Sequence, residues 1–294
     1  MNGRPVASRS RTPLPGRRTR PVRRASAGLS VVRAGAALAM LVSAAAIYGV
    51  GASSAFDYTK LQLAGLTFTD QKAVETALAG ARGANLFGLS TAPLEQALEK
   101  MPTVSSARVQ VQLPGTLAVT VDERKPVLVW KVGQDRYLVD AGGTLFAKLA
   151  PEPPAAARGL PVIDDRRAGG RILEVGGHLD PVDLDAATRL ASLVPADLAS
   201  SATSLGVTVS DENGFVIDAK PAGWSAIFGF YTPSLRTTEL IPEQVRLLRS
   251  LLIGREAQVD RIVLASATDG TYTPRSSPKA SSSPAPKPKA SKAP

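Results

Sequence analysis

The chain has 294 residues, of which 44% are hydrophobic and 20% charged, an ordinary globular composition with room for one large domain or two small ones. It contains no cysteine, which excludes disulfides, thiol nucleophiles and cysteine-containing metal sites, and its single histidine, His178, excludes multi-histidine metal centres. The net charge of +10 comes from the two ends, because residues 34–270 hold 21 basic and 25 acidic residues, which argues against a basic nucleic-acid-binding domain.

Residues 34–56 form a run of 23 residues without a formal charge, which predicts a transmembrane helix. A helix of this length extends roughly 34 Å, and the hydrocarbon core of a bilayer is about 30 Å thick. Nine arginines and no acid lie in residues 1–33, so the positive-inside rule places the N-terminus in the cytoplasm and the rest outside. A cleaved signal peptide has the same charge order, with Ser53-Ser54-Ala55 as a candidate cleavage site, and remains the alternative.

Both basic ends are expected to be disordered. Residues 1–33 are rich in Arg, Pro and Ser and lack the apolar residues of a core. Residues 271–294 are a low-complexity mixture of Pro, Ser, Lys and Ala, typical of an extended spacer.

A small domain is predicted over residues 57–125. An alternating stretch over residues 58–63 is followed by two helices, one capped by Thr69 and one starting near Thr91. Residues 108–122 then alternate with a period of two on both sides of a Pro-Gly turn, which predicts a hairpin. This order predicts a three-stranded sheet backed by two helices. The predicted core includes Leu98, Val109, Val111 and Val119.

The order of these elements, directly after a single apolar segment, resembles the POTRA domain of the bacterial cell-division family FtsQ, called DivIB in some bacteria. Local motifs carry the resemblance: Leu61-Gln62-Leu63-Ala64-Gly65, Asn85-Leu86-Phe87, Met101-Pro102-Thr103-Val104 and Glu123-Arg124-Lys125-Pro126-Val127. The resemblance covers the apolar segment and residues 58–149, and more loosely the chain up to about residue 273. It implies a βααββ POTRA domain followed by the β domain of that family over residues 126–270.

The patterns in residues 126–270 agree with a mixed β-rich domain that also contains helices. Strands are predicted over 127–132, 136–139, 205–209, 215–219, 224–230 and 259–265, and helices after Asp180 and from Pro242. The predicted fold class is therefore α+β, with a single N-terminal transmembrane helix, a small POTRA domain and a mixed β-rich domain. After the last strand the chain soon becomes low in complexity, so the family's C-terminal segment is expected to be shortened.

No group of residues in the sequence predicts catalysis, a cofactor or a metal site. His178 is expected to be a loop or helix-entry residue. The acidic residues Asp164-Asp165 and Asp180/Asp183/Asp185 lack the spacing of a calcium loop, and the second group lies at a predicted helix N-terminus, where carboxylates are favoured. The aromatic cluster Phe228-Gly229-Phe230-Tyr231 is compatible with core packing and with an exposed partner surface.

The last predicted strand is the candidate partner-binding site. A terminal strand followed by unstructured chain can lie at a sheet edge, where unpaired N–H and C=O groups favour the addition of a partner strand. The resemblance implies the same, since FtsQ pairs its C-terminal edge strand with a segment of FtsB/DivIC. The alternative is an interior strand without a partner role. The matching positions here are Arg261, Ile262, Val263, Leu264 and Ala265, with Tyr272 as an aromatic contact beyond them.

The resemblance implies a noncatalytic, bitopic divisome scaffold at the division septum. It would bind FtsB/DivIC-like and FtsL-like division proteins, help to recruit and regulate septal peptidoglycan synthesis, and contact the lipid bilayer through residues 34–56. Neither a nucleic acid nor a small-molecule substrate is expected. Two alternatives from other classes are a POTRA-type polypeptide-transport or membrane-assembly component and a membrane-tethered cell-wall hydrolase.

Overall fold

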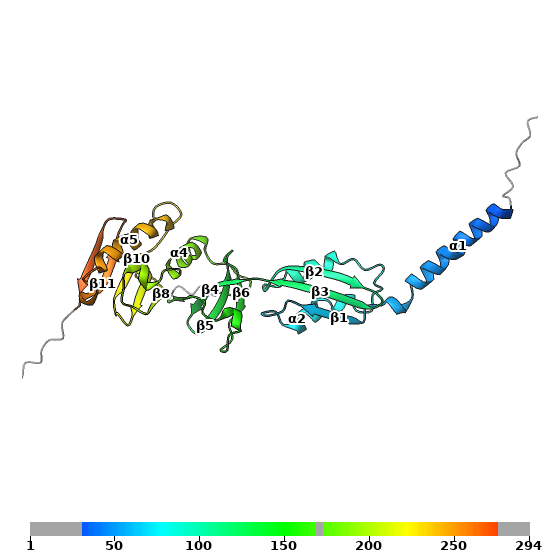
Figure 1. The fold of residues 1–294 in the computed structure, drawn as a ribbon, viewed down its shortest axis with the longest axis horizontal. Coiled ribbons are helices and arrows are strands. Elements are labelled where there is room, and N and C mark those ends of the chain that lie inside the picture. Colours follow the sequence, from blue (N-terminus) through cyan, green and yellow to red (C-terminus); the bar gives the residue numbers. More distant parts are fainter. Residues whose placement is uncertain (1–30, 169–172, 276–294) are drawn as a thin grey trace, which may run out of the picture. The chain divides into compact units, whose positions relative to one another are not determined.

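The computed structural model describes residues 31–168 and 173–275, and the chain divides into two compact units, residues 1–53 and 54–294. The described part of the first unit is helix α1, Val31–Gly51, which is long and apolar enough to cross a membrane and buries none of its residues (Figure 1). The helix begins three residues before the predicted segment 34–56 and ends five residues before its end. The disorder predicted for the two ends of the chain falls mostly on residues 1–30 and 276–294, outside the described residues.

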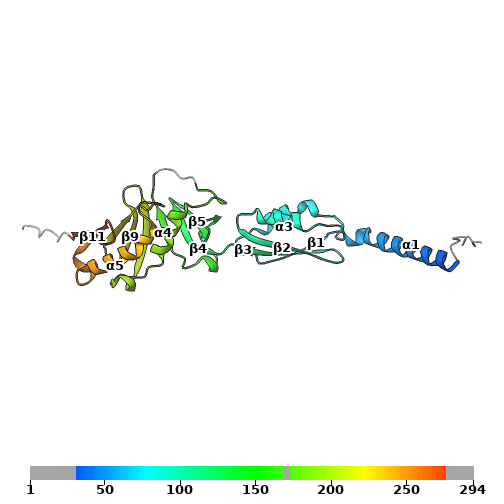
Figure 2. The same cartoon turned by 90° about the horizontal axis from the view of Figure 1, so that it is seen from above.

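The second unit opens with the predicted three-stranded sheet. Its elements are β1 (Lys60–Ala64), α2 (Gln71–Ala77), α3 (Ala92–Glu99), β2 (Val104–Gln112) and β3 (Thr116–Glu123). β3 lies in the middle, parallel to β1 and antiparallel to β2. Figure 2 shows α3 running along one face of this sheet. The predicted βααββ order is confirmed, with the short 3-10 helices η1 (Ser54–Phe56) and η2 (Ala79–Ala81) added.

The core of this βααββ domain lies between the two helices and the sheet. Leu98 of α3, Val109 of β2 and Val119 of β3 are buried as predicted, whereas Val111 is only partly buried against the same cluster. α2 is capped by Asp70, whose carboxylate accepts the N–H of Lys72 at 3.1 Å, one residue later than the predicted cap Thr69. The hydroxyl of Thr69 instead donates to Thr103 Oγ1 at 2.7 Å.

Gly65, which follows β1 directly, has a φ of +87°, and a Cβ there would lie 2.1 Å from the carbonyl oxygen of Val121. Side-chain-bearing residues rarely adopt this conformation, and no side chain fits so close to the neighbouring backbone. The glycine of the Leu-Gln-Leu-Ala-Gly motif is therefore required by the close approach of β1 and β3.

The rest of the second unit is built on a nine-stranded sheet in the order β12-β11-β10-β9-β8-β7-β4-β5-β6. Its strands are β4 (Pro126–Val132), β5 (Asp135–Asp140), β6 (Leu145–Lys148), β7 (Val162–Asp165), β8 (Ser204–Ser210), β9 (Gly214–Lys220), β10 (Ser225–Gly229), β11 (Val259–Leu264) and β12 (Gly270–Pro274). Its helices are α4 (Pro181–Ala191) and α5 (Ile241–Leu252), with short 3-10 helices η3 (Ala155–Ala157), η4 (Pro195–Leu198), η5 (Thr238–Leu240) and η6 (Glu256–Gln258).

Most neighbouring strands are antiparallel, but β4–β7, β7–β8 and β10–β11 are parallel. Parallel neighbours need a long crossover connection, and α4 and α5 lie in two of these connections. Both helices contribute to one apolar core with the sheet, in which Leu190 of α4, Leu248 of α5, Trp130 and Phe228 are buried. The mixed β-rich domain with helices is thus confirmed.

Candidate functional site

The strand predicted as a sheet edge lies inside the sheet. β11 pairs in parallel with β10, where Ser225 lies opposite Arg261, and antiparallel with β12 on its other side. The prediction that residues 261–265 form an edge is therefore wrong, because the chain turns after Leu264 and folds back as β12. The predicted tail 271–294 begins inside this strand, so its first residues are ordered strand and not spacer.

The register of β11 and β12 defines two faces. Ile262 and Leu264 are buried in the core, with Tyr272 and Gly270 directly opposite them on β12. Arg261, Val263 and Ala265 are exposed, and Thr273 and Thr271 lie opposite the first two on the other face. Tyr272 is 45% exposed and Val263 38% exposed, so both faces present side chains to solvent at this edge.

Some backbone groups of β12 point away from β11. The N–H of Ala265 donates to the carbonyl of Asp269 at 2.9 Å, so these opposite residues form a hydrogen-bonded pair. Antiparallel ladders alternate hydrogen-bonded and non-hydrogen-bonded pairs of opposite residues. Thr271 and Thr273 are therefore the residues of β12 whose backbone N–H and C=O groups point toward β11. Gly270 and Tyr272 therefore direct their N–H and C=O groups outward, and within the described residues β12 has no second neighbouring strand.

β12 packs against α5 at its start and is held by hydrogen bonds of Arg275 just after its end. A Cβ on Gly270 would lie 3.2 Å from side-chain carbons of Leu247 and Leu251, so α5 lies directly against the start of the strand. Just after the strand, the N–H of Arg275 donates to the Gln258 carbonyl at 2.6 Å, and its guanidinium donates to the Ala222 carbonyl at 2.9 Å. These contacts fix both ends of β12 against the rest of the domain.

Arg236 joins the ends of β10 and β11. Its guanidinium donates to the carbonyls of Phe228, Leu264 and Ala265 at 2.6–2.8 Å and lies over the ring of Tyr231, 5.8 Å from the ring centroid. Burial raises the pKa of Tyr231, whose hydroxyl donates to the amide oxygen of Gln244 at 2.7 Å. The aromatic cluster is divided, since Phe228 and Tyr231 are buried and Phe230 is 48% exposed.

Glu256 in η6 fixes the chain just before β11. Its carboxylate accepts hydrogen bonds from the hydroxyl of Ser200, the N–H of Ser201 at 2.9 Å and Nε1 of the buried Trp224 at 2.8 Å. Burial opposes ionisation, but these hydrogen bonds outweigh it and lower the pKa of Glu256 to about 2. The Glu256 side chain thus connects η6 to the loop before β8 and to the loop before β10.

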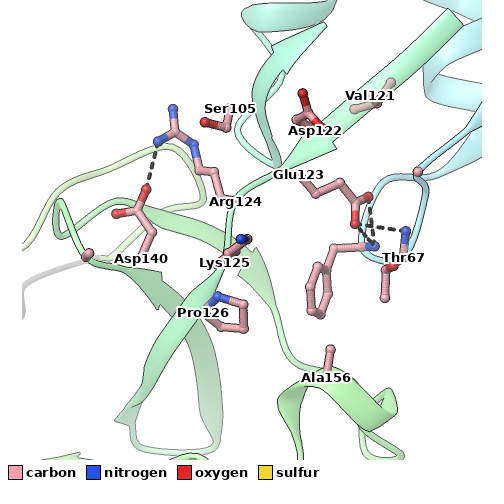
Figure 3. A pocket seen from close by; sticks show the side chains of 13 residues that line it. Thr67, Ser105, Val121, Asp122, Glu123, Arg124, Lys125, Pro126, Asp140 and Ala156 are labelled. Carbon is pink, nitrogen blue, oxygen red and sulfur yellow. Dashed lines mark hydrogen bonds and ion pairs between the residues drawn. The ribbon is translucent and has the colours of Figure 1, made fainter.

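A hollow of about 670 Å³ lies where β3 passes into β4. Figure 3 shows that three charged groups of its lining, Glu123, Arg124 and Asp140, contact protein atoms. The Glu123 carboxylate accepts the backbone N–H groups of Thr67, Phe68 and Thr69 at 2.6–2.9 Å, and Arg124 forms a 2.7 Å ion pair with Asp140. Burial opposes ionisation of both acids, but the hydrogen bonds outweigh it and lower the pKa of Glu123 and Asp140. The Arg124–Asp140 pair joins the end of the βααββ domain to β5, and the Glu123 contacts hold the loop before α2 within that domain.

The other polar residues singled out in the sequence have structural partners. His178 Nε2 lies 3.2 Å from Thr144 Oγ1, and Asp180 caps α4 by accepting the Val182 N–H at 2.9 Å. Ion pairs join Asp164 to Lys131, Asp165 and Asp183 to Arg167, and Asp185 to Arg189. Among residues 31–168 and 173–275, no three His, Cys, Asp or Glu side chains are grouped as metal ligands.

Comparisons with known sequences bear on the family resemblance. The family model of the FtsQ-type POTRA domain matches residues 56–124. The chain is 29% identical over 220 residues to cell division protein FtsQ of Mycobacteroides abscessus, covering 72% of this chain and 63% of the relative. It is 28% identical over 179 residues to FtsQ of Chloroflexus aggregans, covering 61% and 64%, and 28% identical over 215 residues to FtsQ of Streptomyces venezuelae, covering 69% and 78%. The chain thus spans less than two thirds of the length of the first two relatives. The matches to FtsQ proteins and to the FtsQ-type POTRA domain confirm the predicted resemblance.

Proposed function

We propose that this chain, a relative of the FtsQ proteins with an FtsQ-type POTRA domain, is a noncatalytic scaffold of the bacterial division machinery. In this proposal α1 crosses the cell membrane once, with the N-terminus in the cytoplasm and the POTRA and nine-stranded domains outside. The protein acts at the division septum, where it helps to recruit and regulate septal peptidoglycan synthesis. The length and apolar composition of α1 and the arginines before it support this topology.

The observation that carries the proposal is the outward-facing backbone of β12. Its partner is a strand of an FtsB/DivIC-like protein, which adds to the sheet beside Gly270–Pro274 and occupies the groups that point away from β11. An FtsL-like protein joins through this partner. β-Augmentation derives affinity from main-chain hydrogen bonds and specificity from alternate side chains, and Tyr272 is the exposed aromatic side chain on this strand.

The residues first assigned to the edge keep a smaller role in this proposal. Arg261 and Val263 lie on the exposed face of β11 next to β12, and Ala265 follows directly after β11, so these residues can contact side chains of the added strand. Ile262 and Leu264 hold the strand in the core and do not touch the partner.

Proline substitutions in β12 test the edge directly. Tyr272→Pro removes an outward N–H and leaves the ladder with β11 intact, so binding is expected to be lost while the melting temperature is kept. Thr271→Pro is the matched control, because it removes an inward N–H and is expected to lower both. Tyr272→Ala separates the contribution of the aromatic ring. The measurement is co-purification of the full-length chain with the FtsB/DivIC homologue of the same bacterium, together with thermal unfolding.

Binding by a well-folded Tyr272→Pro variant at the wild-type level would reject the β12 edge as the site. Localisation of a fluorescent fusion tests the wider role. Enrichment at midcell supports a division protein, and a uniform membrane signal counts against it and favours the transport or hydrolase alternatives.

A further inference from the structure

An exposed apolar tip lies at the end of the POTRA domain where the chain enters from α1. Phe56 and Phe87 pack edge to face with their ring centroids 4.8 Å apart, and Phe87 remains 59% exposed. Leu113, in the turn between β2 and β3, is 50% exposed. We refer to Phe56, Phe87 and Leu113 as the apolar tip.

Backbone contacts hold the three segments of the tip together. The N–H of Leu86 donates to the Phe56 carbonyl at 2.9 Å, which places the loop of Phe87 beside the entry of the chain. The N–H groups of Thr59 and Lys60 donate to the Gly115 carbonyl at 3.0 Å, which brings the turn of Leu113 to the same end. Asn85 Oδ1 accepts the N–H of Phe87 at 3.0 Å and fixes the loop locally. The apolar tip is thus a defined surface, although its side chains do not contribute to the domain core.

The short chain between α1 and the apolar tip limits how far the tip can lie from the bilayer. A helix over Val31–Gly51 is roughly 31 Å long, so when it spans the hydrocarbon core Gly51 lies near the outer boundary of that core. Phe56 follows five residues later, which allows at most about 17 Å of extended chain. The 3-10 turn over Ser54–Phe56 shortens this reach, because its rise is only about 2 Å per residue. Phe56 is therefore tethered at the depth of the lipid headgroups or just beyond them.

The charged groups around the tip balance one another, so they do not repel a lipid surface. Within residues 56–60, 82–90 and 112–116 the ionisable groups besides Tyr58 are Asp57, Lys60 and Arg82, and Glu75 lies beside Arg82 and Tyr58, which gives no net charge. Lys60 and Arg82 are both exposed. Aromatic and aliphatic side chains flanked by basic residues are the composition that binds at the boundary of headgroups and acyl chains.

We infer that the apolar tip inserts Phe87 and Leu113 into the outer headgroup layer of the membrane and so rests the POTRA domain on a phospholipid surface. The contact buries the apolar edge of the Phe56–Phe87 pair and gives the domain a second attachment to the bilayer besides the anchor. Because this contact rests on the proposed membrane anchor α1, its test includes a probe in that helix.

The absence of cysteine allows clean labelling at single positions. Full-length variants Phe87→Cys and Leu113→Cys carry an environment-sensitive fluorophore and are reconstituted into vesicles of phosphatidylcholine and phosphatidylglycerol. Leu113→Cys leaves the Phe56–Phe87 pair intact and guards against a folding defect of the first variant. Leu235→Cys is the aqueous control, because Leu235 is 93% exposed in the loop between β10 and α5, and Leu41→Cys reports on α1.

We expect lipids with a spin label near the headgroup to quench the probes at 87 and 113, and aqueous iodide to quench them several-fold less than the probe at 235. Strong iodide quenching at 87 and 113, with the probe at 41 in lipid, would overturn the inference and leave the anchor standing. A probe at 41 that is also in water would reject both. Shielding at 87 in native membrane vesicles but not in pure lipid would assign the tip to a protein partner and overturn the lipid contact.

Discussion

Substituting Glu256 by glutamine measures how much one carboxylate contributes to the C-terminal half of the large sheet. Its three donors are the hydroxyl of Ser200, the N–H of Ser201 and Nε1 of Trp224, and Trp224 is 1% exposed. Hydrogen bonds to a charged acceptor contribute about 1.5–3 kcal/mol, and a buried donor left unpaired costs about 1–3 kcal/mol. Glutamine keeps one acceptor oxygen but places an amide N–H₂ against the remaining donors. Because the group is partly solvated, we expect a loss of about 2 kcal/mol in the free energy of unfolding.

For a domain of 150–250 residues, a loss of about 2 kcal/mol lowers the melting temperature by roughly 4–8 °C. The assay is thermal unfolding of the full-length protein, followed by circular dichroism at neutral pH. Glu212→Gln, in the exposed turn between β8 and β9, is the matched control and is expected to leave the melting temperature unchanged.

The same variant makes a pH prediction. An unfolded glutamate titrates near pH 4.3, and the folded pKa of Glu256 is lowered to about 2. The stabilising contribution is therefore complete above about pH 5 and is lost as the pH falls toward about 2. The gap between wild type and Glu256→Gln should narrow on acidification. Equal melting temperatures at pH 7, or a gap of constant size between pH 7 and pH 3, would refute the role given to this carboxylate.

Three further outcomes are expected. Leu98→Ala should lower the free energy of unfolding of the POTRA domain by about 2–5 kcal/mol. Val111→Ala should lower it by less, because the side chain of Val111 is only partly buried. Equal losses of the two variants in denaturant titrations would contradict this packing. Gly65→Ala should prevent correct pairing of β1 with β3, seen as lost dispersion in NMR spectra, whereas Gly80→Ala, which meets no atom within 4 Å, should not. The intact mass of membrane-extracted protein should include α1, and a mature N-terminus near Phe56 would instead identify a cleaved signal peptide.

The sequence predicts those helices and strands whose own residues show a clear helical or alternating pattern of apolar side chains. The hairpin over residues 108–122 and the two POTRA helices alternate or repeat clearly, and the structure has them at nearly the predicted positions. β12 is different, because its four exposed residues and one partly buried glycine bury little surface and precede a low-complexity segment. An Asp-Gly pair followed by Thr-Tyr-Thr is the signal that indicates a returning strand.

Whether a strand is an edge depends on its neighbours and not on its own composition. The sequence pattern of β11 is the same whether or not β12 lies beside it. The edge of the sheet is therefore one strand beyond the strand that the sequence predicts as the edge. Glu123 and Arg124 were similarly beyond prediction, because their partners Thr67 and Asp140 come from other parts of the chain. Local pattern locates the elements, and long-range contacts decide which of their groups remain free.

The strand order of the large sheet also sets a length. β4 follows the POTRA domain after two residues, and β12 lies six strands away from it in the same sheet. Neighbouring strands are spaced about 4.8 Å apart, so the interval from β4 to β12 is about 29 Å across the sheet. Inserting or deleting a hairpin would change this interval in steps of about 10 Å. The number of strands in this sheet therefore determines how far the outer strand β12 lies from the point where the POTRA domain joins it.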